Sequence, residues 1–306
     1  MKIGVYGGTF NPPHLGHVTA ARAVFELLKL DLLLLVPDGQ PPHKMLPPGS
    51  PSPEQRLEMT RLAGEQLGLG ERVRTLDLEL KREGRSYTAE TLRQLHQQYP
   101  GRFIGVAGID PQDGEAALRE IDRFVVNGIC RGVLVEPGFC RRPVRADDRS
   151  LYIFYEKCQE LHIPVFLSFG GYVAPDLSYA DPMIIERVAL DFPTLTLIVA
   201  HGGWPFVPAI CHVAFNREHV YLAPDLYTMN VPGNRDYLDA ANYLIPEKFM
   251  FGTAYPCVDM RQAVAYYRAW GLRPEVMPGV MYGNAARVLG LPQETGNRAV
   301  KNSVMD

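Results

Sequence analysis

Short apolar segments alternate with helical stretches along most of this 306-residue chain, and this alternation most constrains its fold. Parallel strands need a long crossover connection, usually a helix, so the pattern predicts a parallel α/β protein built from βα repeats. Helices are expected near 15–29, 53–67 and 87–98 in the first third. The expected strands cover 2–6, 31–37, 73–78, 103–108, 132–136, 164–168, 195–201, 220–224 and 249–253.

These strands divide the chain into two parts. Residues 1–101 hold three strands and are expected to form a Rossmann-like part. Residues 102–291 hold six, which predicts an incomplete (β/α)8 TIM-barrel-like part, because a full barrel has eight. The N-terminal strands either replace missing barrel strands or form a small open sheet beside an incomplete barrel. The tail over 292–306 is polar, and we expect it to be loosely ordered.

Composition favours a small-molecule partner. A net charge of −3 gives no reason to expect binding to nucleic acid or to an anionic membrane. The longest apolar stretch, 27–37, is too short to span a bilayer, and the start of the chain lacks a signal-peptide pattern, so a cytoplasmic location is expected. The five cysteines lack metal-site or redox spacing and are expected to be reduced and mostly buried, while homo-oligomerisation stays open.

The run from Gly7 to His17, GGTFNPPHLGH, directly follows the first expected strand. A strand that ends in glycines and opens onto a helix presents backbone N–H groups and the positive end of the helix to an anion. Two imidazoles, His14 and His17, lie three residues apart beside these amides. The run predicts a phosphate-binding turn, and the alternative is a tight turn with two hydrated histidines.

The run resembles the nicotinate mononucleotide adenylyltransferases of the nucleotidyltransferase superfamily, and the resemblance covers roughly residues 1–101. Further matches are Pro41-Pro42-His43-Lys44, the helix over 54–62 with Arg56, and the segment 84–92. The resemblance implies binding of ATP with Mg²⁺ and of nicotinate mononucleotide, and adenylyl transfer in NAD biosynthesis. It implies that Gly7, Gly8, Thr9, Phe10, His14 and His17 bind ATP, that His14, His17 and Lys44 serve catalysis, and that Ser86, Tyr87 and Thr88 contact the nicotinate ring.

Such a reaction needs alignment and charge neutralisation more than a protein nucleophile, so the absence of an obvious nucleophile does not count against it. One expected segment is missing. The family closes its ATP site with a later Ser-Ser/Ala-Thr-x-x-Arg-like stretch, and no counterpart follows Gly101. We therefore expect ATP binding to be retained more readily than turnover.

The second part resembles the metal-dependent amidohydrolases of the decarboxylase-like branch. The matching segments are 99–111, 131–133, 198–203, 251–256 and 283–287. Such enzymes hold a divalent metal at the C-terminal mouth of the barrel, with ligands from the first, fifth and eighth strands. Here the first-strand histidine pair is missing, Ser168 stands at the fifth-strand position and Ala254 at the eighth-strand position, so only His201 remains.

A single histidine cannot hold a catalytic metal, so we expect no tightly bound transition metal and interpret His201 as a hydrogen-bonded remnant. Asp225 and Asp259 are interpreted as turn or surface carboxylates, and Trp204 as core or pocket lining. Two alternatives to the nucleotide function remain. One is a metal-dependent amidohydrolase or decarboxylase of small carboxylated substrates, and the other is a non-catalytic hybrid with vestigial sites.

Overall fold

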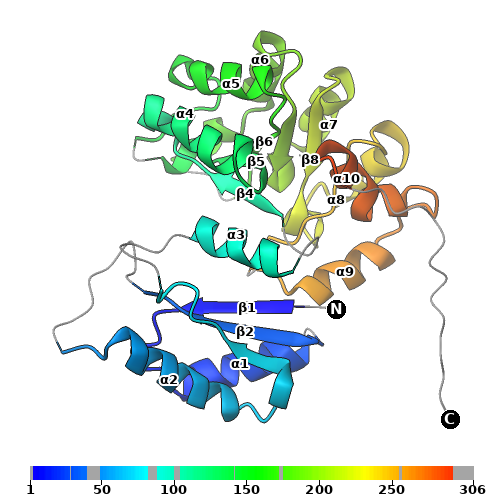
Figure 1. Ribbon diagram of the computed structural model, residues 1–306. Coiled ribbons are helices and arrows are strands. Elements are labelled where there is room, and N and C mark those ends of the chain that lie inside the picture. The colour runs from blue at the N-terminus through cyan, green and yellow to red at the C-terminus, as the bar shows by residue number, and fades with distance from the viewer. Residues whose placement is uncertain are drawn as a thin grey trace. The chain divides into compact units, whose positions relative to one another are not determined.

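The computed structural model describes residues 3–27, 29–39, 49–81, 88–99, 104–140, 142–171, 175–254 and 257–291. The chain divides into two compact units, Met1–Gly105 and Val106–Asp306, which are described separately. Each unit is a parallel sheet covered by helices (Figure 1), so the predicted parallel α/β class is confirmed. The predicted boundary between 101 and 102 and the predicted loose tail both fall on residues outside the described ranges.

The first unit contains a three-stranded sheet in the order β1 (Ile3–Gly8), β2 (Leu32–Pro37), β3 (Val73–Thr75). All pairs are parallel, with Ile3 opposite Leu32 and Leu33 opposite Val73. The central strand β2 is buried at each of its six residues. This explains its unbroken apolar sequence, because a strand covered on both faces has no solvent-facing positions.

Alternate residues of β2 pack against different helices. Leu33 and Leu35 belong to a cluster with Ala21 and Phe25 of α1 (Leu15–Leu27), whereas Leu32 and Leu34 pack with Leu95 of α3 (Thr88–Gln98). Successive side chains of a strand point to opposite faces, which places α1 and α3 on opposite sides of the sheet. Figure 1 shows α2 (Pro53–Glu65) beside α1 and α3 across the sheet.

The second unit contains a five-stranded sheet in the order β4 (Gly105–Gly108), β5 (Cys130–Val135), β6 (Val165–Ser168), β7 (Leu197–Ala200), β8 (Val220–Ala223). The pairs from β5 to β8 are parallel, and their buried valines and leucines join one hydrophobic core with the surrounding helices. These helices are α4 (Glu115–Ile121), α5 (Tyr152–Glu160), α6 (Pro182–Asp191), α7 (Val207–Asn216), α8 (Asn234–Asp239), α9 (Met260–Ala269) and α10 (Asn284–Val288).

Several expected strands are shorter than predicted, three of them clearly. The strand expected over 195–201 covers only Leu197–Ala200. The strand expected over 73–78 ends at Thr75. The strand expected over 249–253 is reduced to one parallel bridge between Leu222 and Phe249. Gly252 lies so close to Asp225 that a Cβ there would be 3.0 Å from the Asp225 Cβ, and Ala254 turns the chain with a φ of 49°.

The described strands form two separate sheets, so β1, β2 and β3 pair with one another and not with β4 to β8. In the described part of the chain, every helix is too short or too polar to cross a membrane. All five cysteines are free, and Cys130, Cys158 and Cys211 are buried. The Rossmann-like interpretation of the first unit stays a prediction.

Candidate functional site

The turn after β1 is shaped by a buried aromatic residue. Gly7 and Gly8 end the strand, and Phe10 then adopts a left-handed backbone conformation with a φ of 46°. Its side chain is only 3% exposed, and its ring packs edge-on against Tyr6 with centroids 5.5 Å apart. A non-glycine residue tolerates this conformation only where its surroundings compensate, and burial of the Phe10 ring supplies that compensation.

The two histidines lie together at the start of α1. Their ring centroids are 3.9 Å apart, and the His14 backbone N–H donates to Nδ1 of His17 over 3.1 Å. Because Nδ1 accepts this bond, neutral His17 carries its proton on Nε2. Gly16 permits the arrangement, since a Cβ there would lie 2.9 Å from the His14 ring.

His17 is the more sheltered of the two histidines. Its ring lies edge-on to Phe10, with centroids 5.2 Å apart, whereas His14 is exposed. Burial lowers the pKa of His17, and the neighbouring His14 lowers it further. His17 is therefore mainly neutral near pH 7 and can donate through Nε2. It also lines a shallow apolar pocket with Tyr6, Phe10, Pro13, Val18, Ala21, Leu35, Thr60, Ala63 and Leu67.

A buried arginine ties the loops after β1 and β2 together. Arg56 of α2 is 0% exposed, and its Nη1 donates to the backbone oxygens of Thr9 (2.9 Å) and Asp38 (2.6 Å). Its Nη2 donates to the Gly39 oxygen over 2.8 Å, and Nη1 lies 3.3 Å from the Asp38 carboxylate. The Thr9 hydroxyl donates to the same carboxylate over 3.0 Å.

The structure therefore brings together the predicted residues from Gly7 to Phe10, His14 and His17. Lys44, Ser86 and Tyr87 lie outside the described residues. Thr88 begins α3, but its side chain is also outside what is described. The predicted roles of these four residues stay predictions. Arg56 is part of the resemblance to the adenylyltransferases. Its contact with Asp38 could not be predicted, because the two residues are 18 positions apart in the sequence.

The second unit brings His201 and Asp225 together at the ends of β7 and β8. His201 Nδ1 lies 2.8 Å from Asp225 Oδ2, and both residues have left-handed backbones, with φ of 64° and 46°. Burial acts to lower the pKa of His201, but the hydrogen bond and the charge of Asp225, aided by Glu136, outweigh it, so the pKa is raised. His201 is hydrogen-bonded, as expected of a remnant.

The surface interpretation of Asp225 is wrong. Asp225 is 6% exposed, and its second oxygen, Oδ1, is buried without a hydrogen-bond partner in the described part of the chain. Its position after a parallel strand was the available signal, because the C-terminal strand ends are where α/β proteins place functional groups. Asp259 does lie at a helix start, where its carboxylate accepts from the backbone N–H groups of Arg261 and Gln262.

Aromatic side chains flank this pair. The Trp204 and Tyr227 rings stack with centroids 5.4 Å apart, and the Trp204 indole N–H donates to the Pro232 oxygen over 3.0 Å. The Tyr227 and His201 rings are nearly perpendicular, with centroids 5.9 Å apart. Trp204 also packs against the core, which agrees with its interpretation as core or pocket lining.

A cleft of about 310 Å³ lies at the ends of β4 and β5. Cys140 in this cleft is a poor nucleophile, because burial, followed by the neighbouring Asp110 and other carboxylates, raises its thiol pKa to about 12. The lining residues are Gly108, Ile109, Asp110, Leu134, Glu136, Phe139 and Cys140.

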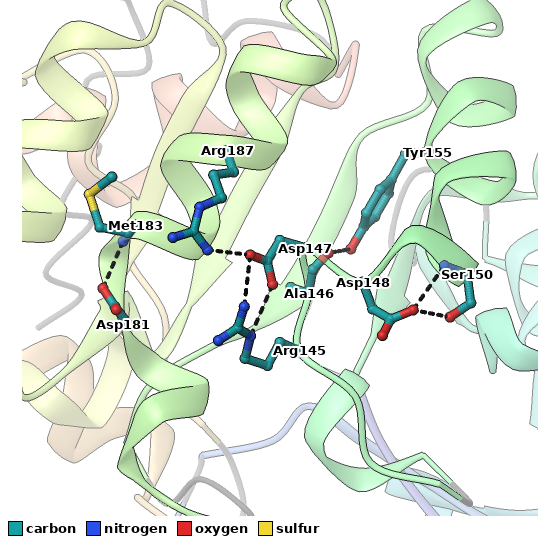
Figure 2. Close-up of polar contacts among 9 residues, drawn as sticks. All are labelled: Arg145, Ala146, Asp147, Asp148, Ser150, Tyr155, Asp181, Met183 and Arg187. Atoms are coloured by element: carbon teal, nitrogen blue, oxygen red, sulfur yellow. Dashed lines mark hydrogen bonds and ion pairs between the residues drawn. The ribbon is translucent and has the colours of Figure 1, made fainter.

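The segment that follows this cleft is anchored to two helices (Figure 2). Asp147, whose side chain is 7% exposed, forms ion pairs with Arg145 and with Arg187 of α6. The hydroxyl of Tyr155 on α5 donates to the Ala146 oxygen over 3.0 Å. These contacts attach the connection between β5 and α5 to the helices beside it.

The residues at the strand ends do not fit a divalent metal. Ser168 ends β6 and Ala254 follows the bridge at Phe249, so neither position offers an imidazole or carboxylate. Within the described residues, no group of three histidine, cysteine, aspartate or glutamate side chains is placed to hold a metal ion.

One protein family matches most of the length of the chain. The family model described as Amidohydrolase matches residues 35–291. The chain belongs to the amidohydrolase family. An uncharacterised TIM-barrel protein from Bordetella bronchiseptica is 28% identical, with a TM-score of 0.62 covering 94% of this chain and 98% of that one. A 2,6-dihydroxybenzoate decarboxylase from Rhizobium has a TM-score of 0.57 at 14% identity, which shows a shared fold alone.

This amidohydrolase-family chain also shares sequence with nicotinate-nucleotide adenylyltransferases. A probable enzyme of that name from Shouchella clausii is 46% identical over 124 residues, 40% of this chain and 62% of that relative. One from Shewanella woodyi is 35% identical over 162 residues, 51% of this chain and 70% of that relative. The chain spans less than two thirds of the first of these, so it contains only part of that protein's length.

Proposed function

We propose that the first unit binds the triphosphate of a nucleotide, ATP with Mg²⁺, at the turn between β1 and α1. The observation that supports this most directly is the His14–His17 contact, in which a backbone N–H occupies Nδ1 of His17 and leaves Nε2–H as a donor. The pair lies at the N-terminal end of a 13-residue helix, where the helix dipole favours an anion. The backbone N–H groups of His14, His17 and Val18 are already bonded within this turn, so the Nε2–H of His17 is the donor on which the proposal depends.

The finer proposal is adenylyl transfer to a nicotinate mononucleotide-like phosphate. A phosphate oxygen of the acceptor attacks the α-phosphorus of ATP, the bond to the β-phosphate oxygen breaks, and pyrophosphate leaves with that electron pair. His17 donates a hydrogen bond to the charge that develops on the phosphates, and His14 orients the triphosphate. The similarity to nicotinate-nucleotide adenylyltransferases supports this acceptor class.

Calorimetry of the full chain with ATP–Mg²⁺ tests the binding proposal. We expect saturable binding by the wild type and an affinity about tenfold or more lower for His17→Ala, because one charge-assisted hydrogen bond is lost. His212→Ala is the matched control, since His212 is an exposed helical histidine of the second unit. Absent binding by the wild type, or equal binding by wild type and His17→Ala, contradicts the proposal.

A second candidate function is hydrolysis or decarboxylation of a small carboxylated substrate by the amidohydrolase-like unit. The His201–Asp225 contact favours it, because a histidine held by a buried carboxylate serves as an acid–base group. Elemental analysis of the purified chain tests whether this activity depends on a metal. A metal-dependent enzyme should contain about one tightly held zinc or manganese per chain. A folded chain with neither nucleotide nor metal affinity favours the third interpretation, a non-catalytic hybrid.

A further inference from the structure

Among the described residues of the first unit, Arg56 is a buried cation that contacts the turn proposed to bind phosphate. Arg56 lies on α2, and its guanidinium reaches the ends of two strands that are adjacent in the sheet. Both of its Nη atoms donate to backbone oxygens, and a backbone oxygen is present whatever side chain its residue carries. Such bonds hold the path of a backbone more directly than a bond to a flexible side chain.

The contact with Thr9 bears on the histidines. Thr9 is followed at once by Phe10, whose ring is buried and packs edge-on against His17. A shift of the Thr9 carbonyl therefore moves the left-handed residue that supports the His17 ring. Arg56 itself is 0% exposed and lies behind the backbone, so it is placed to act through the turn and not on a ligand.

The contacts with Asp38 and Gly39 bear on the next loop. Both residues follow β2, and the Asp38 backbone N–H donates to the Gly8 oxygen over 3.0 Å. The Asp38 carboxylate accepts from the Thr9 hydroxyl as well as lying near Arg56. Arg56 and Asp38 thus form a closed network that joins both loops at the C-terminal edge of the sheet. This network also neutralises the buried charge.

We propose that Arg56 is the positioning residue of the nucleotide site: it fixes the β1–α1 turn relative to the start of the loop after β2. This inference rests on the proposed nucleotide function. Lysine cannot replace arginine here, because a single ammonium lacks the planar fork that reaches Thr9, Asp38 and Gly39 together. The inference therefore predicts a loss of ligand affinity that exceeds what loss of fold stability alone causes.

The test uses the full chain and compares Arg56→Lys and Arg56→Met with Leu95→Ala. Leu95 is 0% exposed and packs on the opposite face of the same sheet, so its truncation destabilises the unit without touching the turn. At a temperature where all variants are folded, we expect both Arg56 variants to bind ATP–Mg²⁺ about tenfold or more weakly. Leu95→Ala is expected to stay within about twofold of the wild type.

Hydrogen exchange without ligand separates this inference from the proposed function. We expect faster exchange at residues 8–10 and 38–39 in both Arg56 variants, relative to Leu95→Ala. That result supports the positioning role even where the wild type takes up no ATP, which would overturn the nucleotide proposal alone. Unchanged exchange in these two loops overturns the positioning role. Where the wild type binds ATP, equal ATP affinity in Arg56→Met and Leu95→Ala overturns it as well.

Discussion

His201 and Asp225 form the most protected ionisable pair among the described residues at the strand ends of the second unit. Asp225 is 6% exposed and keeps one oxygen without a partner, so the carboxylate depends on the imidazole to compensate its charge. Removing one member of such a pair leaves the other buried and unpaired, which costs more than the pair itself contributes.

Asp225→Asn is expected to lower the pKa of His201 and to destabilise the chain by about 2 kcal/mol at about pH 6. The pKa of His201 is raised from 6.5 in the folded chain, so the pair stabilises the fold fully below the unfolded pKa. This contribution is lost as the pH rises through the raised folded pKa. Urea unfolding at several pH values measures it.

The matched control for Asp225→Asn is Asp259→Asn, which changes a helix-capping carboxylate instead. We expect the difference in unfolding free energy between wild type and Asp225→Asn to shrink from about pH 6 to about pH 8.5, and that of Asp259→Asn to stay constant. A difference that grows with pH for Asp225→Asn shows that the imidazole and the carboxylate do not form a charged pair.

At the residue scale, sequence predicted the residues that a local motif defines. Gly7 to His17 lie in one run, so their proximity follows from a turn and one helical step. The partners of Arg56 could not be predicted in this way, because Thr9 lies 47 positions away and meets it only after the sheet has formed. The burial of Asp225 was missed for the same reason, since Gly252 covers it from another segment.

At the element scale, the connection between β5 and α5 depends on a few side chains for its position. Tyr155 is fully buried, and its hydroxyl is the donor for the Ala146 oxygen. The Asp147 carboxylate is bound by arginines from its own segment and from α6. Because these contacts reach two different helices, loss of one of them loosens the segment without unfolding the unit.

Tyr155→Phe is expected to lower the free energy of unfolding by about 1–2 kcal/mol, because the buried Ala146 carbonyl loses its donor. Hydrogen exchange should accelerate over residues 142–150 in particular. Tyr221→Phe on β8 is the control, since within the described part of the chain the Tyr221 hydroxyl makes no hydrogen bond. Equal effects of the two substitutions would contradict an anchoring role for Tyr155.

The element boundaries were mostly predictable because burial and periodicity agree in them. The central strand β2 reads as an unbroken apolar run and is buried throughout. The strand expected over 249–253 has the same apolar character, but it forms a single bridge at Phe249, and Ala254 then adopts a left-handed conformation. Local composition does not reveal such a turn, because it depends on what the segment meets in space.

At the scale of the whole molecule, each unit has its own interior. The hydrophobic clusters of the first unit contain residues between 3 and 99, and that of the second unit contains residues between 107 and 281. Two unrelated sets of motifs divide the sequence into two parts, and the exact boundary between 101 and 102 stays a prediction. These motifs gave no basis for choosing between two sheets and one, because strand pairing is a long-range property.

Separate interiors predict separate unfolding transitions. Leu34→Ala and Leu167→Ala both remove a side chain that is 0% exposed, the first from β2 and the second from β6. We expect each to lower the stability of its own unit by about 2–5 kcal/mol. Both tryptophans, Trp204 and Trp270, belong to the second unit, so their fluorescence reports on that unit alone.

Leu167→Ala should therefore shift the fluorescence transition in urea. Leu34→Ala should leave that transition in place and shift only part of the change in far-ultraviolet circular dichroism. A fluorescence midpoint that moves equally in both variants would mean that the two units unfold as one cooperative system.

One cysteine of the second unit should react with a thiol-specific label in preference to the others. Cys257 is exposed, whereas Cys130, Cys158 and Cys211 are enclosed by the core and the pKa of Cys140 is raised to about 12. A maleimide dye added to the unaltered chain should therefore attach at Cys257, which supplies a native labelling position for energy-transfer measurements without engineered cysteines.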